Sequence, residues 1–120
     1  MFGMPLRSIS IFCYVWSYVV RPECLSAFRT AYGPDGDWVR LFRRDPEYVR
    51  TTLLGDRDNP TRFMTIDFWA SREACLSFRE RFHGEFEALD KSFDQLTVQE
   101  SHLGDFEVLD ESISAERPKN

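Results

Sequence analysis

Residues 9–20 read Ile-Ser-Ile-Phe-Cys-Tyr-Val-Trp-Ser-Tyr-Val-Val, and this stretch decides the fold. It is rich in β-branched and aromatic residues and contains no Gly or Pro, which predicts a strand. Alternate residues of a strand point to opposite faces of its sheet. Both alternating sets are mainly apolar, with Phe12, Tyr14, Trp16, Tyr18 and Val20 on one face and Ile11, Cys13, Val15, Ser17 and Val19 on the other. We therefore expect both faces of this strand to be covered, one by helices of the same chain and the other by a partner subunit.

Two helical segments follow this strand. Pro22 suits the first position of a helix, where a missing N–H costs nothing. The helix that it opens carries an apolar stripe of Leu25, Phe28 and Tyr32 and ends at Gly33-Pro34. A short helical turn then places Trp38, Leu41 and Phe42 on one face.

The second half of the chain predicts a hairpin, a helix and a last strand. Residues 48–54 and 62–70 alternate as strands, and the short link between them favours an antiparallel hairpin. Ser71 is a suitable N-cap for a helix that we expect to kink near Gly84. The last strand should run from about residue 96 to 109, with an interruption at Gly104-Asp105.

This order of elements is the ferredoxin-like split βαβ arrangement, an α+β fold with one antiparallel sheet and both main helices on one face. The other face of the sheet would be apolar and bare, so the sequence predicts a homodimer through that face. We expect a single domain over residues 1–111 and a polar, flexible tail over residues 112–120.

Composition excludes several classes of function. Fifteen basic residues against twenty acidic ones give a net charge of −5, and only Lys91 and Lys119 are lysines, which argues against nucleic-acid binding. The apolar run at residues 9–20 is too short to span a bilayer. Three cysteines without metal-type spacing favour reduced thiols in a cytoplasmic protein. Eleven Phe, four Tyr and three Trp are more rings than the core needs, which indicates an aromatic pocket or interface.

The pattern resembles the dimeric α+β barrel superfamily, in particular its antibiotic biosynthesis monooxygenase-like branch. The similarity covers roughly residues 10–109 and is carried by three motifs, Trp38-x-x-Leu41-Phe42, Tyr48-x-x-Thr51-x-Leu53-Leu54 and Asp67-x-Trp69-x-Ser71, and by the Phe-bearing helix and closing strand that follow. The resemblance implies a homodimer with sheets packed face to face and a pocket between sheet and helices. The best-known enzymes of the branch oxidise aromatic polyketide intermediates with O2 and no cofactor.

A related branch of the superfamily binds and degrades haem, typically with an Asn, a Trp and a His. Here the asparagines are Asn59, in a predicted loop, and Asn120, at the terminus. Neither can be an inward-facing strand residue, so haem chemistry is disfavoured.

Asp67 is the most informative polar residue, because a carboxylate inside a covered sheet is costly unless it is paired. One interpretation is a general base with a raised pKa that deprotonates a phenol or an activated carbon acid. The alternative, which is the commoner outcome, is a structural ion pair with an arginine such as Arg50 or a capping role at the end of the strand. His83 and His102 are further candidate bases, although a surface histidine is the commoner outcome for each.

Aromatic residues provide the candidate substrate-binding side chains. Trp16 and Trp69 could stack on a planar ligand, and the hydroxyl groups of Tyr14 and Tyr48 could donate to a quinone oxygen. A core position is the commoner outcome for a tryptophan in a small domain, and the two tyrosines could also be core residues. Arg21, Arg50 and Arg62 could hold an anionic group or pair with acids.

The leading hypothesis is a homodimeric monooxygenase-like protein that binds a small aromatic or hydrophobic molecule and uses no metal, flavin or other cofactor. No glycine-rich phosphate loop or His/Cys cluster is present in the sequence to hold one. The alternatives are a non-catalytic binding or dimerisation module of the same fold, and an isomerase or decarboxylase that needs the same base.

Overall fold

The structure is a computed structural model, and it describes residues 10–112. The described part of the chain contains four strands and four helices: β1 (Phe12–Val20), α1 (Leu25–Tyr32), α2 (Asp37–Phe42), β2 (Tyr48–Gly55), β3 (Arg62–Trp69), α3 (Arg72–Arg81), α4 (His83–Phe93) and β4 (Thr97–Glu107). Short 3-10 turns precede α1 at Pro22–Cys24 and β4 at Asp94–Leu96. Most of the predicted tail, residues 113–120, lies outside the described residues, as does Ile9.

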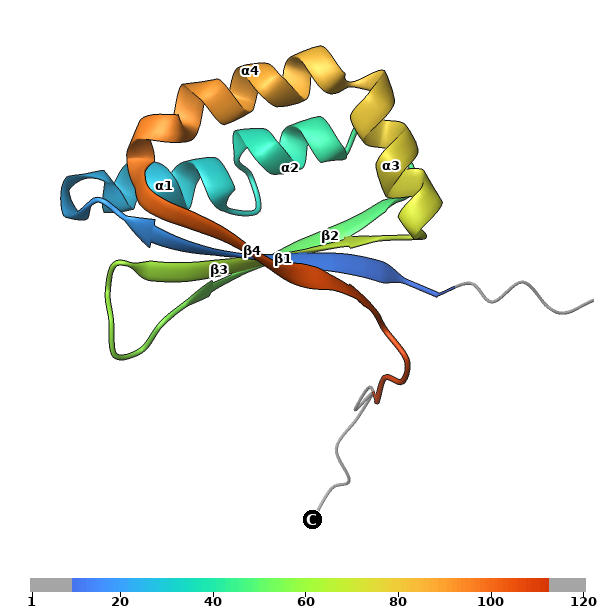
Figure 1. Cartoon of the computed structure of the whole chain (residues 1–120), viewed down its shortest axis with the longest axis horizontal. Coiled ribbons are helices and arrows are strands. Elements are labelled where there is room, and N and C mark those ends of the chain that lie inside the picture. The colour runs from blue at the N-terminus through green and yellow to red at the C-terminus, as the bar shows by residue number, and fades with distance from the viewer. Residues whose placement is uncertain (1–9, 113–120) are drawn as a thin grey trace, which may run out of the picture.

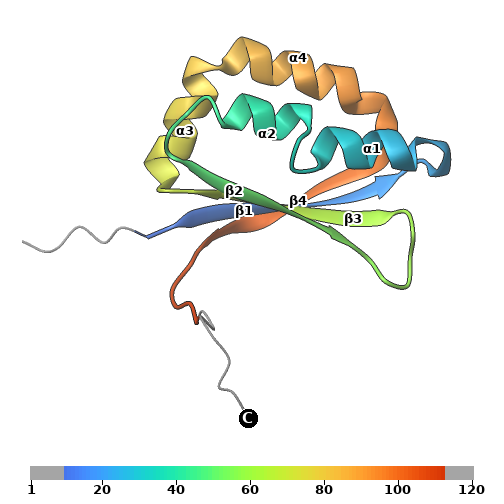
Figure 2. The same ribbon diagram turned by 180° about the vertical axis from the view of Figure 1, so that it is seen from behind.

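The strands form one antiparallel sheet in the order β2-β3-β1-β4. This order and the helices confirm the predicted ferredoxin-like α+β fold. All four helices lie on one side of the sheet, and none covers the other side (Figure 1). The view from behind shows the same two layers (Figure 2). We call the two sides the covered face and the open face.

Local sequence explains where the helices begin. The Ser71 hydroxyl accepts a hydrogen bond of 3.0 Å from the backbone N–H of Ala74, so the predicted N-cap is confirmed. Pro22 occupies the first position of the 3-10 turn that leads into α1. The predicted kink near Gly84 is a full break two residues earlier, because α3 ends at Arg81 and α4 begins at His83.

The core lies between the covered face and the helices and is largely aromatic. Trp69, Phe28 and Phe78 are completely buried. Trp69 contacts the rings of Phe42, Tyr48 and Phe78 at centroid distances of 5.7, 5.5 and 4.9 Å. Such ring pairs add directional contacts to the burial of apolar area and hold the helices on the sheet.

The last strand departs from its predicted form. We expected an interruption at Gly104-Asp105, but β4 continues to Glu107. A register shift opposite Val15 and Trp16 leaves Leu103 as the extra residue of a bulge. Gly104 has a φ of 157°, and a Cβ there would lie 3.0 Å from the Phe106 ring. Glycine therefore allows the strand to absorb the bulge and continue.

The open face is apolar, as the alternation of β1 predicts. Residues paired in register share a face of the sheet. Val15 pairs with Ile66, Cys13 with both Phe68 and Phe106, and Leu54 with Met64. Leu54 and Phe106 are 43% and 50% exposed. Among residues 10–112 no helix is long and apolar enough to cross a membrane.

Candidate functional site

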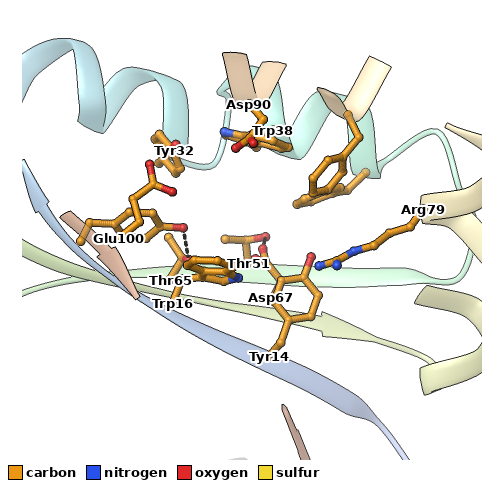
Figure 3. Close-up of a pocket in the computed structure, with 13 residues that line it drawn as sticks. Tyr14, Trp16, Tyr32, Trp38, Thr51, Thr65, Asp67, Arg79, Asp90 and Glu100 are labelled. Atoms are coloured by element: carbon orange, nitrogen blue, oxygen red, sulfur yellow. Dashed lines mark hydrogen bonds between the residues drawn. The ribbon is translucent and has the colours of Figure 1, made fainter. Parts of the chain in front are cut away.

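A cavity of about 200 Å³ lies between the covered face of the sheet and the helices. Strands β1, β2, β3 and β4 and helices α1, α2, α3 and α4 all contribute to its wall (Figure 3). Its lining residues are mostly aromatic with a few polar groups, namely Tyr14, Trp16, Tyr18, Tyr32, Trp38, Phe42, Thr51, Thr65, Asp67, Arg79, Phe86, Asp90 and Glu100. Apolar walls with a few polar groups are typical of small-molecule sites.

Asp67 lies on the floor of this cavity and is only 6% exposed. The Thr51 hydroxyl donates a 2.5 Å hydrogen bond to its Oδ1 atom. Burial raises the pKa of Asp67 to about 7, although the Thr51 hydrogen bond and the positive charge of Arg79 lower it. A carboxyl group in this position exchanges its proton near neutral pH, as a general acid or base must.

Tyr48 reaches Asp67 through Thr51. The Tyr48 hydroxyl lies 2.6 Å from Thr51 Oγ1. Because the single hydroxyl proton of Thr51 is directed to Asp67, Tyr48 must donate to Thr51 while the carboxylate is ionised. The resulting chain of hydrogen bonds from β2 to β3 fixes the orientation of the carboxylate. Tyr48 itself is not among the residues that line the cavity.

Arg79 supplies the positive charge of the cavity. Arg79 is an exposed residue of α3, but its guanidinium group points towards Tyr14 and Asp67 in the cavity (Figure 3). It lies 5.1 Å from the centre of the Tyr14 ring and 5.2 Å from that of Phe86. It also hydrogen-bonds the Tyr14 hydroxyl group, whose pKa is raised by burial and by Asp67. Among residues 10–112, no carboxylate lies within salt-bridge distance of Arg79.

The predicted alternative for Asp67, an ion pair with Arg50, does not form. Residue 50 pairs in register with Phe68, and the Arg50 guanidinium group lies 3.9 Å from the centre of the Phe68 ring. Residues 67 and 68 point to opposite faces of the sheet, so Arg50 belongs to the open face. Within the described part of the chain, Asp67 makes no salt bridge.

The other predicted site residues lie at different distances from the cavity. Tyr14 and Trp16 line it. Trp69 does not, because its ring is wholly enclosed by the core. His102 lies on β4 next to the cavity wall, with its ring 5.3 Å from Trp16 and its Nε2 atom 2.9 Å from Asp105. His83 is an exposed residue at the start of α4, beside Glu87, and does not line the cavity.

Several lining residues were missed from the sequence, above all Arg79, Thr51 and Glu100. Arg79 stands in the run Arg79-Glu80-Arg81, which reads as a solvated mixed-charge surface. A signal was present, since Arg79 follows Cys75 by one helical turn and so borders the buried stripe of α3. Glu100 pairs in register with Tyr18, on the covered side of β1, but that register cannot be deduced before the bulge in β4 is known.

Within residues 10–112, no group of three His, Cys, Asp or Glu side chains could hold a metal ion.

Solved structures with the same fold support the resemblance predicted from the sequence. The chain superposes on SnoaB from Streptomyces nogalater, a cofactor-independent oxygenase, with a TM-score of 0.62 and 22% identity over 89% of this chain and 99% of that one. It also superposes on a protein from Nitrosomonas europaea that is provisionally described as an antibiotic biosynthesis monooxygenase, with a TM-score of 0.64 and 14% identity over 88% and 96% of the two chains. A Pseudomonas aeruginosa protein, PA3566, matches with a TM-score of 0.61 and 14% identity over 86% and 97%.

These similarities show that this chain has the fold of the antibiotic biosynthesis monooxygenase-like proteins. No family model matches the sequence, and no curated protein matches it.

Proposed function

We propose that this protein binds a small aromatic hydroxy compound in the cavity and oxygenates it with O2 without a cofactor. The observation that carries the proposal is that one cavity contains both a buried carboxyl group with a pKa of about 7, Asp67, and a guanidinium group, Arg79, which forms no salt bridge with a carboxylate of residues 10–112. The shared fold with SnoaB, a cofactor-independent oxygenase, supports the same class of reaction.

Each polar group has a role in this reaction. The Asp67 carboxylate removes the proton of the ligand's acidic group, and Thr51 holds the carboxylate in place. Arg79 stabilises the anion that forms, because its guanidinium charge points into the cavity. Trp16 and Phe86 fix the plane of the ring.

The electron-rich anion then reacts directly with O2. The ring carbon that reacts loses its one hydrogen and gains one oxygen atom, and the hydroxyl group loses the other hydrogen, so that both carbons become carbonyl carbons of a quinone. The second oxygen atom leaves as water with these two hydrogens. The step from phenol and O2 to quinone and water therefore balances without an external reductant, since the substrate itself supplies the electrons that O2 takes up.

We also propose that the protein works as a homodimer through its open face. Leu54 and Phe106 are large apolar side chains left exposed on this face, next to the half-buried Ile66 and Phe68. In a two-fold dimer the same surface of each chain meets its copy, so the open face of a second chain covers these side chains. Light scattering should give twice the mass of one chain, and a monomer at micromolar concentration would contradict this part of the proposal.

A ligand screen followed by an oxygen assay tests the catalytic proposal. Phenols of one, two and three rings are first ranked by thermal shift, since a ligand that binds the folded state raises its apparent stability. Those that bind are then used in an oxygen-uptake assay. Asp67→Asn should lower the turnover rate about 100-fold or more and retain ligand binding. Asp110→Asn, the same change at an exposed residue beyond the end of β4 and outside the cavity lining, is the control.

Binding without oxygen uptake in the wild-type protein would reject the oxygenase and leave a binding module. Equal uptake by Asp67→Asn and wild type would reject Asp67 as the base.

A further inference from the structure

The charged side chains of the cavity differ between its two ends, so each end favours a different chemical group of a ligand. Arg79 and Asp67 lie together at one end, and Glu100 lies with Tyr32 at the other (Figure 3). The proposed function uses the first end only. The second end is part of the same cavity and has no role in proton removal.

Carboxylates gather around Tyr32 at this second end. Glu100, Asp90 and Asp94 all act electrostatically on the Tyr32 hydroxyl group, whose pKa burial raises. Glu100 and Asp90 also line the cavity. The Thr97 hydroxyl donates to Glu100 at 2.9 Å, but among residues 10–112 none of the three acids forms a salt bridge.

Trp38 forms the wall of this end together with Tyr32. Trp38 is 8% exposed and lines the cavity, and its ring centre lies 6.2 Å from that of Tyr32. A side-chain hydrogen bond with Trp38 lowers the pKa of the Tyr32 hydroxyl group against the larger effect of burial. The two rings therefore form one aromatic wall beside Glu100 and Asp90.

The balance of charge and the rings select the kind of ligand. The lining holds one guanidinium group, Arg79, against three carboxyl groups, Asp67, Asp90 and Glu100. A positively charged group is therefore favoured near Glu100, and the faces of Tyr32, Trp38 and Trp16 around it can bind an ammonium group by cation–π contact. A negatively charged substituent would be repelled there.

The volume limits the size of the ligand. A cavity of about 150 Å³ can hold benzene, and this one measures about 200 Å³. One or two rings with a short substituent fit this space.

We propose that the cavity binds a one- or two-ring phenol that carries a basic amine on the side away from its acidic hydroxyl group. The hydroxyl group lies at Asp67 and Arg79, and the ammonium group lies at Glu100 and Asp90. This inference rests on the proposed function, because it takes the first end as the hydroxyl subsite, and it adds the class of substrate.

Three phenols that differ only at one end test it. Isothermal titration compares tyramine, 4-ethylphenol and 3-(4-hydroxyphenyl)propanoate, which carry an ammonium group, no charge and a carboxylate. Tyramine should bind about tenfold more tightly than 4-ethylphenol, from ion pairing and cation–π contact together, and the propanoate should bind more weakly than both.

Single variants test which residues cause the preference for tyramine. Glu100→Gln and Asp90→Asn should each reduce the preference for tyramine and leave the affinity for 4-ethylphenol unchanged. Asp110→Asn removes an acidic residue that lies beyond the end of β4 and outside the lining, so it controls for the net charge of the protein. It should retain the full preference.

Each outcome decides a different claim. Equal affinities for tyramine and 4-ethylphenol would overturn the amine inference and leave the proposed phenol site intact. A preference that Asp110→Asn reduces as much as Glu100→Gln would also overturn it, since the attraction would then be a general effect of charge. Failure of all three phenols to bind would overturn both the inference and the proposed function.

Discussion

The two faces of the sheet are built from the same alternating strands but meet different surroundings. On the covered face, β3 presents Phe63, Thr65, Asp67 and Trp69, each at most 8% exposed beneath the helices. On the open face the intervening residues Met64, Ile66 and Phe68 are only half-buried, and no helix of residues 10–112 lies over them. The apolar content of the faces is similar, so composition alone does not distinguish a core from an interface. The difference lies in whether the chain itself supplies the cover.

Neighbouring residues of β3 offer the strongest test of this difference. Trp69→Ala removes a ring that is wholly buried against Phe42, Tyr48 and Phe78, and should lower the free energy of unfolding by about 3–5 kcal/mol. Phe68→Ala, one residue earlier on the open face, should cost about 1–2 kcal/mol. Urea unfolding of both variants measures the two values.

Protein concentration sharpens the same experiment. If a second copy covers the open face, the loss caused by Phe68→Ala should grow with protein concentration, because dimerisation stabilises the folded state by mass action. The loss caused by Trp69→Ala should be the same at every concentration. Equal losses from the two variants at all concentrations would contradict the distinction between the faces.

Sequence patterns were sufficient to predict the architecture, because the burial of one face of a strand or helix gives its apolar residues a regular spacing. The first strand, the hairpin at 48–54 and 62–70 and the Ser71 cap each follow from local rules. The hairpin and the cap lie where they were predicted, and β1 begins at Phe12, inside the predicted strand. The bulge at Leu103 was missed, since one extra residue in a strand leaves little trace in an alternating pattern.

The site was predictable only in part, because it depends on contacts between distant elements. Asp67 stood out as a carboxylate in an apolar strand, and Tyr14 and Trp16 followed from their face of β1. Arg79 was assigned to a solvated surface, although α3 turns its guanidinium group into the cavity. The predicted ion-pair partner of Asp67 was also wrong. Arg50 lies on the neighbouring strand β2, but its side chain points to the other face of the sheet.

The pH dependence of stability should differ between the faces, because in residues 10–112 the buried carboxyl group with a raised pKa, Asp67, lies on the covered face. The pKa of Asp67 is about 7 in the folded protein against an ordinary value of 3.8. Between these values the folded state binds more protons than the unfolded state, so the free energy of unfolding falls as pH rises from about 4 to 7. The full contribution amounts to at most about 4 kcal/mol.

Asp67→Asn should remove this slope and make the protein more stable than wild type at pH 8. Asp110→Asn, which changes an exposed acid outside the covered face, should retain the wild-type slope. Thermal unfolding from pH 4 to pH 8 measures all three proteins. A wild-type slope in Asp67→Asn would show that the carboxyl group titrates normally and would contradict its assignment as a base near neutral pH.

The smallest expected effect comes from a comparison of two apolar side chains that are almost equally exposed, one on the sheet and one on the helical layer. Phe106 on the open face is 50% exposed, and Leu76 on α3 is 49% exposed. If the open face is the dimer interface, Phe106→Ala should cost about 1 kcal/mol of association free energy in each copy, from the half of the ring that the partner would bury. The two copies together should raise the dimer dissociation constant roughly 30-fold. Leu76→Ala should leave that constant unchanged, because α3 lies on the other layer. Sedimentation at a series of concentrations measures both, and a larger effect from Leu76→Ala would assign the interface to the helical layer instead.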